Sequence, residues 1–268
     1  MADPAAVLTD LGAEGDAVDA LVADLPIERW GAQTPAPGWT IADQVAHLAW
    51  TDEIAHAAAT EPDRFQGVLA QAAADPAGFV DAAAHSGAAR PPAELLATWR
   101  AGRRRLAGTL AAVPAGSRIT WFGPPMTATT MATARLMETW AHGLDIAETL
   151  GASMPVTGRL RHVAHLGVRT RDFAYLVHGR TPPADDFRVE LAGPDGELWA
   201  WGPPDAEQQI AGPALDFCLL VTQRRHRADL ELVASGPDAE EWLDIAQAFA
   251  GPPGSGRTHT GLAPIAES

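Results

Sequence analysis

A glutamate and a histidine placed four residues apart are the side chains of this sequence best suited to chemistry. Glu138 and His142 lie in segment 135–147, whose apolar residues recur at helical spacing. Residues four apart on a helix share one face, one turn apart. Since a buried carboxylate must be paired, neutralised or bound to a metal, the two side chains form either half of a metal site or a hydrogen-bonded pair without metal.

A third donor is available on another expected helix. His47 lies near the middle of segment 40–59, on the same row as Asp43, Trp50 and Ile54. Two imidazoles and one carboxylate would make an open site that suits catalytic Zn²⁺ and also accepts Fe²⁺ or Ni²⁺. The alternative role for His47 is that of a hydrogen-bonded core histidine.

The elements that must position these donors are long amphipathic helices. Helical periodicity predicts four of them before residue 150, at about 4–25, 40–59, 92–113 and 127–149. Thr40 and Asp43 have the spacing of a capping box. Segment 61–90 is expected to hold one or two short helices. Four long helices predict a four-helix bundle, whose core commonly hosts metal sites built from facing helices.

The pattern changes after a fifth expected helix, at 159–179, and the pair Pro182-Pro183. Alternation predicts a hairpin of strands 187–191 and 198–201. A helix at 206–224, a strand at 230–233 and a helix at 238–250 are expected to follow. The predicted fold is mainly α with a smaller α+β part. Its domains are a bundle over 1–155, a connecting helix and linker over 156–184, and a small α+β domain over 185–268.

Composition restricts the functional classes. The chain has 268 residues, 47% of them hydrophobic, and a net charge of −15. This charge argues against nucleic-acid binding through phosphate contacts. The single cysteine, Cys218, excludes an intrachain disulfide and lies in apolar sequence that indicates a buried thiol. No signal peptide and no membrane-spanning stretch are evident, so we expect a cytoplasmic monomer or homodimer that acts on a small molecule.

Two motifs resemble a known family. Residues 38–48 (GWTIADQVAHL) and 138–147 (ETWAHGLDIA) resemble the metal-binding domain of mycothiol-dependent maleylpyruvate isomerases, within the DinB-like four-helix-bundle superfamily. The resemblance covers roughly residues 1–155 and implies His47, Glu138 and His142 as the metal ligands. Residues 217–226 and 246–254 resemble an actinobacterial two-domain branch of that family.

The resemblance implies thiol chemistry. In the isomerase family a divalent metal, usually taken as zinc, holds the sulfur of mycothiol. A free thiol with a pKa of about 8.5 is mostly protonated at neutral pH, and metal coordination removes that proton. The prediction is a metal-dependent, thiol-using transferase or isomerase that acts on a small anionic or electrophilic metabolite.

Anion recognition has its own candidates. Arg224 and Arg225, with His226, are positioned in the sequence of the smaller domain to bind a substrate carboxylate, because arginine binds carboxylates through two parallel hydrogen bonds. Their alternative role is surface ion pairing.

Two other functions use the same residues. The first is a thiol-independent metal-dependent hydrolase, lyase or cyclase of secondary metabolism, in which the metal activates water or polarises a carbonyl. The second is a non-catalytic bundle that binds a ligand or partner. An open three-ligand site argues against the second, because structural zinc normally has four protein ligands.

Overall fold

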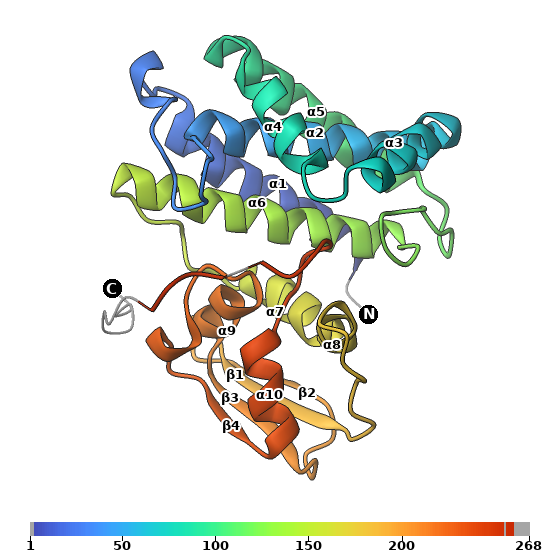
Figure 1. Cartoon of the computed structure of the whole chain (residues 1–268), viewed down its shortest axis with the longest axis vertical. Coiled ribbons are helices and arrows are strands. Elements are labelled where there is room, and N and C mark those ends of the chain that lie inside the picture. The colour runs from blue at the N-terminus through green and yellow to red at the C-terminus, as the bar shows by residue number, and fades with distance from the viewer. Residues whose placement is uncertain (1–2, 255, 260–268) are drawn as a thin grey trace. The chain divides into compact units, whose positions relative to one another are not determined.

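The chain forms two compact units, Met1–Pro155 and Val156–Ser268. The computed structural model describes residues 3–254 and 256–259; residues 1–2, 255 and 260–268 of the predicted domains lie outside the described residues. The predicted fold class, mainly α with a smaller α+β part, is confirmed (Figure 1).

The first unit is the predicted four-helix bundle. Its long helices are α1 (Pro4–Val22), α2 (Ile41–Thr60), α5 (Pro92–Ala112) and α6 (Ala128–Leu150). Helix α1 packs on α6, and α2 packs on both α5 and α6 (Figure 1). The region between α2 and α5 holds α3 (Pro62–Ala74) and α4 (Phe79–Ala88), as expected, and a 3-10 turn (Ile27–Arg29) follows α1.

Local signals set the ends of the two helices that carry the candidate donors. Helix α2 begins with the predicted capping box: the Asp43 amide donates to Thr40 Oγ1 and the Thr40 amide donates to Asp43 Oδ2. Helix α6 begins after Thr127, whose hydroxyl caps the Thr130 amide, and it ends at Gly151 in the left-handed conformation (φ 67°). These caps fix how far along each helix the donors lie.

Apolar burial holds the bundle together. Each large side chain that is fully buried contributes about 1.5–3 kcal/mol relative to exposure. In the bundle these side chains are Ile41, Leu48, Phe65, Leu95, Trp99, Leu106, Met131, Leu136 and Ile146.

One buried ion pair joins α2 to α6. Arg135 Nε donates to Asp52 Oδ1 at 3.0 Å, and both side chains are almost completely buried. Burial raises the pKa of the Asp52 carboxyl, and the nearby Arg135 guanidinium opposes that shift. The pair therefore fixes the register of the two helices, at a desolvation cost that limits its net stabilisation.

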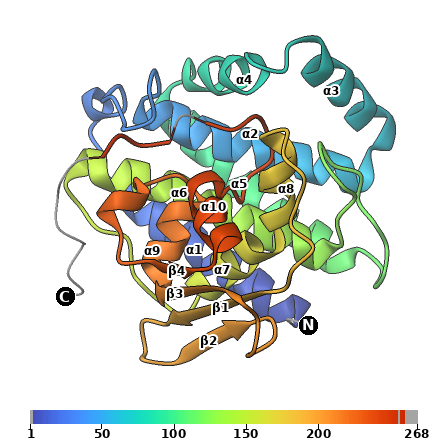
Figure 2. The same ribbon diagram turned by 60° about the horizontal axis from the view of Figure 1, so that its bottom comes forward.

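The second unit contains a small mixed sheet. Helices α7 (Leu160–Arg169) and α8 (Arg171–Val177) precede strands β1 (Phe187–Ala192), β2 (Leu198–Trp201), β3 (Gln208–Pro213) and β4 (Val233–Ser235). Their order is β2-β1-β3-β4, with β1 parallel to β3 and the other pairs antiparallel (Figure 2). Helices α9 (Ala214–Val221) and α10 (Pro237–Ile245) pack on the sheet, and a 3-10 turn (Arg227–Asp229) precedes β4.

Aromatic contacts form the core of this unit. Phe187 of β1 and Phe217 of α9 both lie edge-on against Trp242 of α10. Cys218 is completely buried beside Phe217, and burial raises the pKa of its thiol. The prediction of a buried cysteine is confirmed.

Three predicted element boundaries in this unit need correction. The expected helix at 159–179 breaks at Thr170, whose hydroxyl donates to the carbonyls of Leu166 and Gly167 and so competes with the backbone pattern. The expected strand at 230–233 begins only at Val233, and the expected helix at 238–250 ends at Ile245.

The largest correction concerns segment 206–224, which was predicted as one helix. Its first part is strand β3, which pairs with both β1 and β4, and only Ala214–Val221 is helical. The buried side chain of Gln208 explains why a polar residue starts this strand. Its Oε1 accepts hydrogen bonds from the Asp238 and Ala239 amides and so satisfies the first turn of α10.

Candidate metal centre and a basic cavity

The three predicted donors come together inside the bundle. One ligand atom from each of His47, Glu138 and His142 lies within 4.8 Å of the others. Glu138 Oε2 is 3.1 Å from His142 Nε2 and 3.4 Å from His47 Nε2. The two imidazole centroids are 4.4 Å apart. Two ring nitrogens and a carboxylate oxygen thus converge on one point, as a metal site requires.

The electrostatics of Glu138 favour its charged form. Burial raises the pKa of this carboxyl, but the hydrogen bonds and positive charge of the two imidazoles, in their protonated form, outweigh burial and hold the pKa well below its usual value. Ligating carboxylates must be deprotonated to bind a metal. Glu138 is therefore ready to act as an anionic ligand.

The hydrogen-bond partner of His142 indicates that a cation lies between His142 and Glu138. Its Nδ1 lies 2.5 Å from Gln44 Oε1, an acceptor, so Nδ1 carries a hydrogen. In the neutral ring Nε2 then offers a lone pair toward Glu138 Oε2, which is also an acceptor. Two facing acceptors repel unless a cation, either a proton or a metal ion, lies between them.

A tryptophan covers the two histidines. The Trp39 ring stacks on His142 at a centroid distance of 5.7 Å and an interplanar angle of 16°, and it lies 5.2 Å from His47. Trp39 Nε1 donates to Asp81 Oδ1 at 3.0 Å, which holds the indole in place. Trp50 completes the aromatic surroundings at 6.1 Å from His47. The centre is therefore bordered by aromatic rings that shield the two imidazoles from solvent, whereas the Glu138 side chain stays partly exposed.

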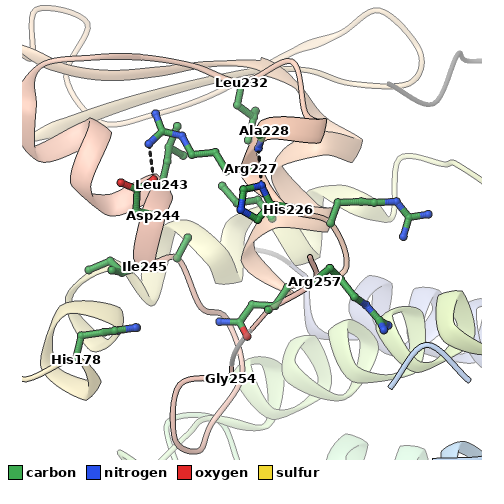
Figure 3. A pocket seen from close by; sticks show the side chains of 15 residues that line it. His178, His226, Arg227, Ala228, Leu232, Leu243, Asp244, Ile245, Gly254 and Arg257 are labelled. Atoms are coloured by element: carbon green, nitrogen blue, oxygen red, sulfur yellow. Dashed lines mark hydrogen bonds and ion pairs between the residues drawn. The ribbon is translucent and has the colours of Figure 1, made fainter. Parts of the chain in front are cut away.

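The second unit contains a cavity of about 420 Å³ (Figure 3). Arg225 and His226 line it, whereas Arg224, the third predicted substrate-binding residue, is not part of the lining. Arg257 and His178 add further basic groups that sequence reasoning missed. A volume of this size suits a small-molecule ligand.

The cavity presents fixed hydrogen-bond donors. His226 Nδ1 accepts from the Ala228 amide at 3.1 Å, so neutral His226 carries its hydrogen on Nε2. Arg227 is neutralised by Asp244 and Glu240, and its pair with Asp244 is visible in Figure 3. The positive-φ backbone of Gln223 (φ 57°), another lining residue, is the kind of strain that clusters at binding sites.

An arginine cluster on α5 has a structural role. Arg100 and Arg103 pair with Asp19, and Arg105 pairs with Glu53. The residue that sequence reasoning missed at the centre is Gln44. Its position three residues before His47, on the same helix face, was the available signal.

Within the described residues, none of the helices combines the length and the apolar character needed to cross a bilayer.

Two solved structures share the fold. The crystal structure of the mycothiol-dependent maleylpyruvate isomerase matches with a TM-score of 0.59 and 15% identity, covering 87% of this chain and 93% of that one. A mutant of a protein of that name matches with a TM-score of 0.57 over the same shares.

Sequence comparisons give the family. Uncharacterized proteins from two strains of Mycobacterium tuberculosis are each 60% identical over 257 residues, which cover 96% of this chain and all of theirs. The family described as wyosine base formation matches residues 183–235. The family described as the mycothiol maleylpyruvate isomerase N-terminal domain matches residues 11–147, half of the chain. The chain belongs to this mycothiol maleylpyruvate isomerase N-terminal domain family.

Proposed function

We propose that the protein is a metal-dependent, thiol-using transferase or isomerase that acts on a small anionic or electrophilic metabolite. His47, Glu138 and His142 are the proposed metal ligands, with Zn²⁺ as the first candidate ion and Fe²⁺ or Ni²⁺ as alternatives. Mycothiol is the proposed thiol co-substrate, in keeping with the family match and with the name of the structural relative.

The observation that carries the proposal is the convergence of two Nε2 atoms on Glu138 Oε2, at 3.1 and 3.4 Å. His142 Nδ1 faces the Gln44 Oε1 acceptor, and its Nε2 faces the Glu138 carboxylate. The donor set is two nitrogens and one oxygen, which fits a borderline-soft divalent cation and leaves coordination positions open.

A divalent metal bound there supplies Lewis acidity, which converts a thiol to the nucleophilic thiolate at neutral pH. The chain's own residues do the rest. Glu138 contributes the negative charge that offsets the metal, and Trp39 and Trp50 keep bulk water from the imidazoles. Cys218 cannot replace the external thiol as nucleophile, because it is buried and its pKa is raised.

Selectivity for an anion is assigned to the second unit. Arg225 and Arg257 line its cavity together with the Nε2–H donor of His226. Arginine binds carboxylates through paired hydrogen bonds. Thiolate addition to an activated double bond, bond rotation and elimination would isomerise an unsaturated carboxylate, whereas addition without elimination would transfer the sulfur group.

The test combines metal analysis with a thiol-dependence assay. Purified protein is analysed for bound metal and then assayed with small electrophilic carboxylates, beginning with maleylpyruvate, with and without mycothiol. About one divalent ion per chain and turnover only with mycothiol support the proposal. Glu138→Gln is the matched variant, because it keeps the size of the side chain and removes its charge, and it should lose both properties.

The other outcomes separate the alternatives. Bound metal with turnover in thiol-free buffer would indicate the thiol-independent hydrolase, lyase or cyclase. A wild-type chain that binds no divalent metal under any reconstitution condition would reject the proposal and leave the non-catalytic bundle.

A further inference from the structure

A row of buried hydrogen bonds ends on His142. Thr34 Oγ1 donates to the Trp39 carbonyl at 2.8 Å. Gln44 Nε2 donates to Thr34 Oγ1 at 2.9 Å, and Gln44 Oε1 lies 2.5 Å from His142 Nδ1. Gln44 is completely buried, on the helix turn before His47. The row therefore links α2, which carries one proposed ligand, to α6, which carries the other two.

The row has a defined direction. A threonine hydroxyl has a single hydrogen, and that of Thr34 is directed to the Trp39 carbonyl. Toward Gln44 the hydroxyl can then act only as an acceptor, so the amide NH₂ group of Gln44 faces Thr34. The carbonyl of the same amide consequently faces His142, and Nδ1 of that ring must carry a hydrogen.

We propose that Gln44 is a positioning residue that holds His142 in its Nδ1–H tautomer and presents the Nε2 lone pair to the metal. This inference rests on the proposed function for its purpose, but its structural statement concerns the chain alone. Gln44 fixes the ring through its hydrogen bond, and Trp39 fixes the ring plane by stacking on it. Ligating histidines are generally oriented in this way by an acceptor on the second nitrogen.

The other histidine shows that this arrangement is specific. His47 Nδ1 is buried and has no hydrogen-bond partner among the described residues. The structure thus builds tautomer control into one imidazole of the pair. Glu138 and His142 lie on the same helix, α6. Because Gln44 also fixes the ring of His142, the two donors of α6 are preorganised to bind a metal.

The decisive variant is Gln44→Leu, which keeps a similar volume and removes the acceptor. Loss of such a partner typically costs about 10–100-fold in metal affinity, and we expect a loss in this range for Zn²⁺ or Co²⁺ measured by competition with a chelator. Gln44→Glu retains an acceptor and should bind within about threefold of the wild type, since carboxylates serve the same role in metal sites. Gln71→Leu, an exposed glutamine on α3, is the control.

A second readout needs no metal. In ¹⁵N-histidine-labelled protein stripped of metal, the neutral form of the His142 ring should show the Nδ1–H tautomer. The signal is assigned by its absence in His142→Ala. Gln44→Leu should shift His142 toward Nε2–H, and Gln44→Glu should not. A merely structural role for Gln44 would leave the tautomer unchanged in every folded variant.

The two proposals fail in different ways. Unchanged metal affinity and an unchanged His142 tautomer in Gln44→Leu would overturn the role of Gln44 while leaving the metal site intact. Absence of metal binding in the wild type would reject the proposed function, yet the tautomer measurement would still test Gln44. If Gln44→Leu does not fold, Gln44→Met provides the test. Its unbranched side chain keeps the shape of glutamine but has only a weakly accepting thioether sulfur, so a wild-type His142 tautomer there would also overturn the inference.

Discussion

The Nε2 atom of His142 lies 3.1 Å from Oε2 of Glu138, one turn earlier on α6. His47 of α2 approaches the same oxygen, so the three donors need both helices in register. Removing one donor should therefore abolish tight binding rather than weaken it slightly.

We predict that the wild type binds about one divalent ion per chain and that His142→Ala loses it, because two remaining donors cannot form an open three-ligand site. Metal content by plasma mass spectrometry measures this. His56→Ala is the control, since His56 lies on α2 but is hydrogen-bonded to Thr109 on α5. Full occupancy in both His47→Ala and His142→Ala would show that the ion is bound elsewhere.

The helix caps and the apolar periodicity were enough to predict the bundle. Thr40, Asp43 and Gly151 mark helix ends through local chemistry that a sequence displays directly. Strand β3 was missed because its burial depends on pairing with β1 and β4, which are distant in sequence. Tertiary pairing of this kind overrides local propensity.

The sequence was enough to predict which residues are candidate donors, but not which hydrogen bonds connect them to other helices. Glu138 and His142 follow from spacing on one helix, whereas the contact between Gln44 and His142 depends on the register between α2 and α6. Helical periodicity gives the face of each residue and not the axial offset of two packed helices. Arg224 and Arg225 lie in the irregular segment after α9, where periodicity assigns no face, so the sequence could not show that Arg225, and not Arg224, lines the cavity.

Close packing beside His142 gives a stability prediction. A Cβ atom on Gly143 would lie 2.6 Å from Val18 Cγ2 and 2.9 Å from Met154 Cε. Gly143→Ala should therefore destabilise the protein by about 1–3 kcal/mol through overpacking. Gly108→Ala, where a Cβ meets nothing within 4 Å, should stabilise α5 by about 0.5–1 kcal/mol. Urea unfolding compares the two, and equal effects would show that α1 does not approach α6 this closely.

The buried Asp52–Arg135 pair predicts non-additive effects. Arg135→Met leaves a buried carboxyl without its partner and should cost about 3 kcal/mol. Asp52→Leu leaves the guanidinium in the same situation. The double variant removes both charges and should be more stable than either single variant, because no desolvated charge remains. Strictly additive losses in a double-mutant cycle of unfolding free energies would contradict this coupling.

The ion pair between α1 and α5 predicts a pH dependence. A hydrogen bond from Arg100 lowers the pKa of Asp19, burial opposes this, and the charges of Arg100 and Arg103 add to the lowering. A lowered folded-state pKa means that the unfolded chain binds more protons, so stability rises with pH. The contribution is complete above the unfolded pKa of about 3.9 and is lost as pH falls through the lower folded value.

Asp19→Asn should accordingly lower the free energy of unfolding by about 1 kcal/mol at neutral pH, in the upper range for partly exposed pairs, and by progressively less as pH falls below the unfolded pKa. Urea midpoints measured from about pH 7 to about pH 3 follow the difference across the unfolded pKa. Asp205→Asn makes the same charge change at an exposed position in the turn before β3 and should leave the profile parallel to that of the wild type. A constant deficit for Asp19→Asn at all pH values would exclude the ion pair as its cause.

If the basic cavity binds the substrate, a variant of its lining should change KM without changing metal content. Arg225 lines the cavity, and its Nη1 also donates to the Arg224 carbonyl, which fixes the guanidinium. Loss of a paired hydrogen bond to a carboxylate should raise KM by about tenfold or more in Arg225→Ala, since hydrogen bonds to charged groups contribute about 1.5–3 kcal/mol. Metal content should stay at the wild-type level.

Steady-state kinetics with an anionic substrate, combined with metal analysis, tests this. Arg29→Ala removes an exposed arginine of the first unit and controls for the change in net charge. Arg224→Ala is the informative comparison, because Arg224 was an equal candidate from the sequence and is absent from the cavity lining. A raised KM in Arg224→Ala with unchanged kinetics in Arg225→Ala would place the substrate carboxylate outside this cavity. A raised KM in Arg225→Ala alone would assign anion recognition to the cavity that Arg225 and His226 share.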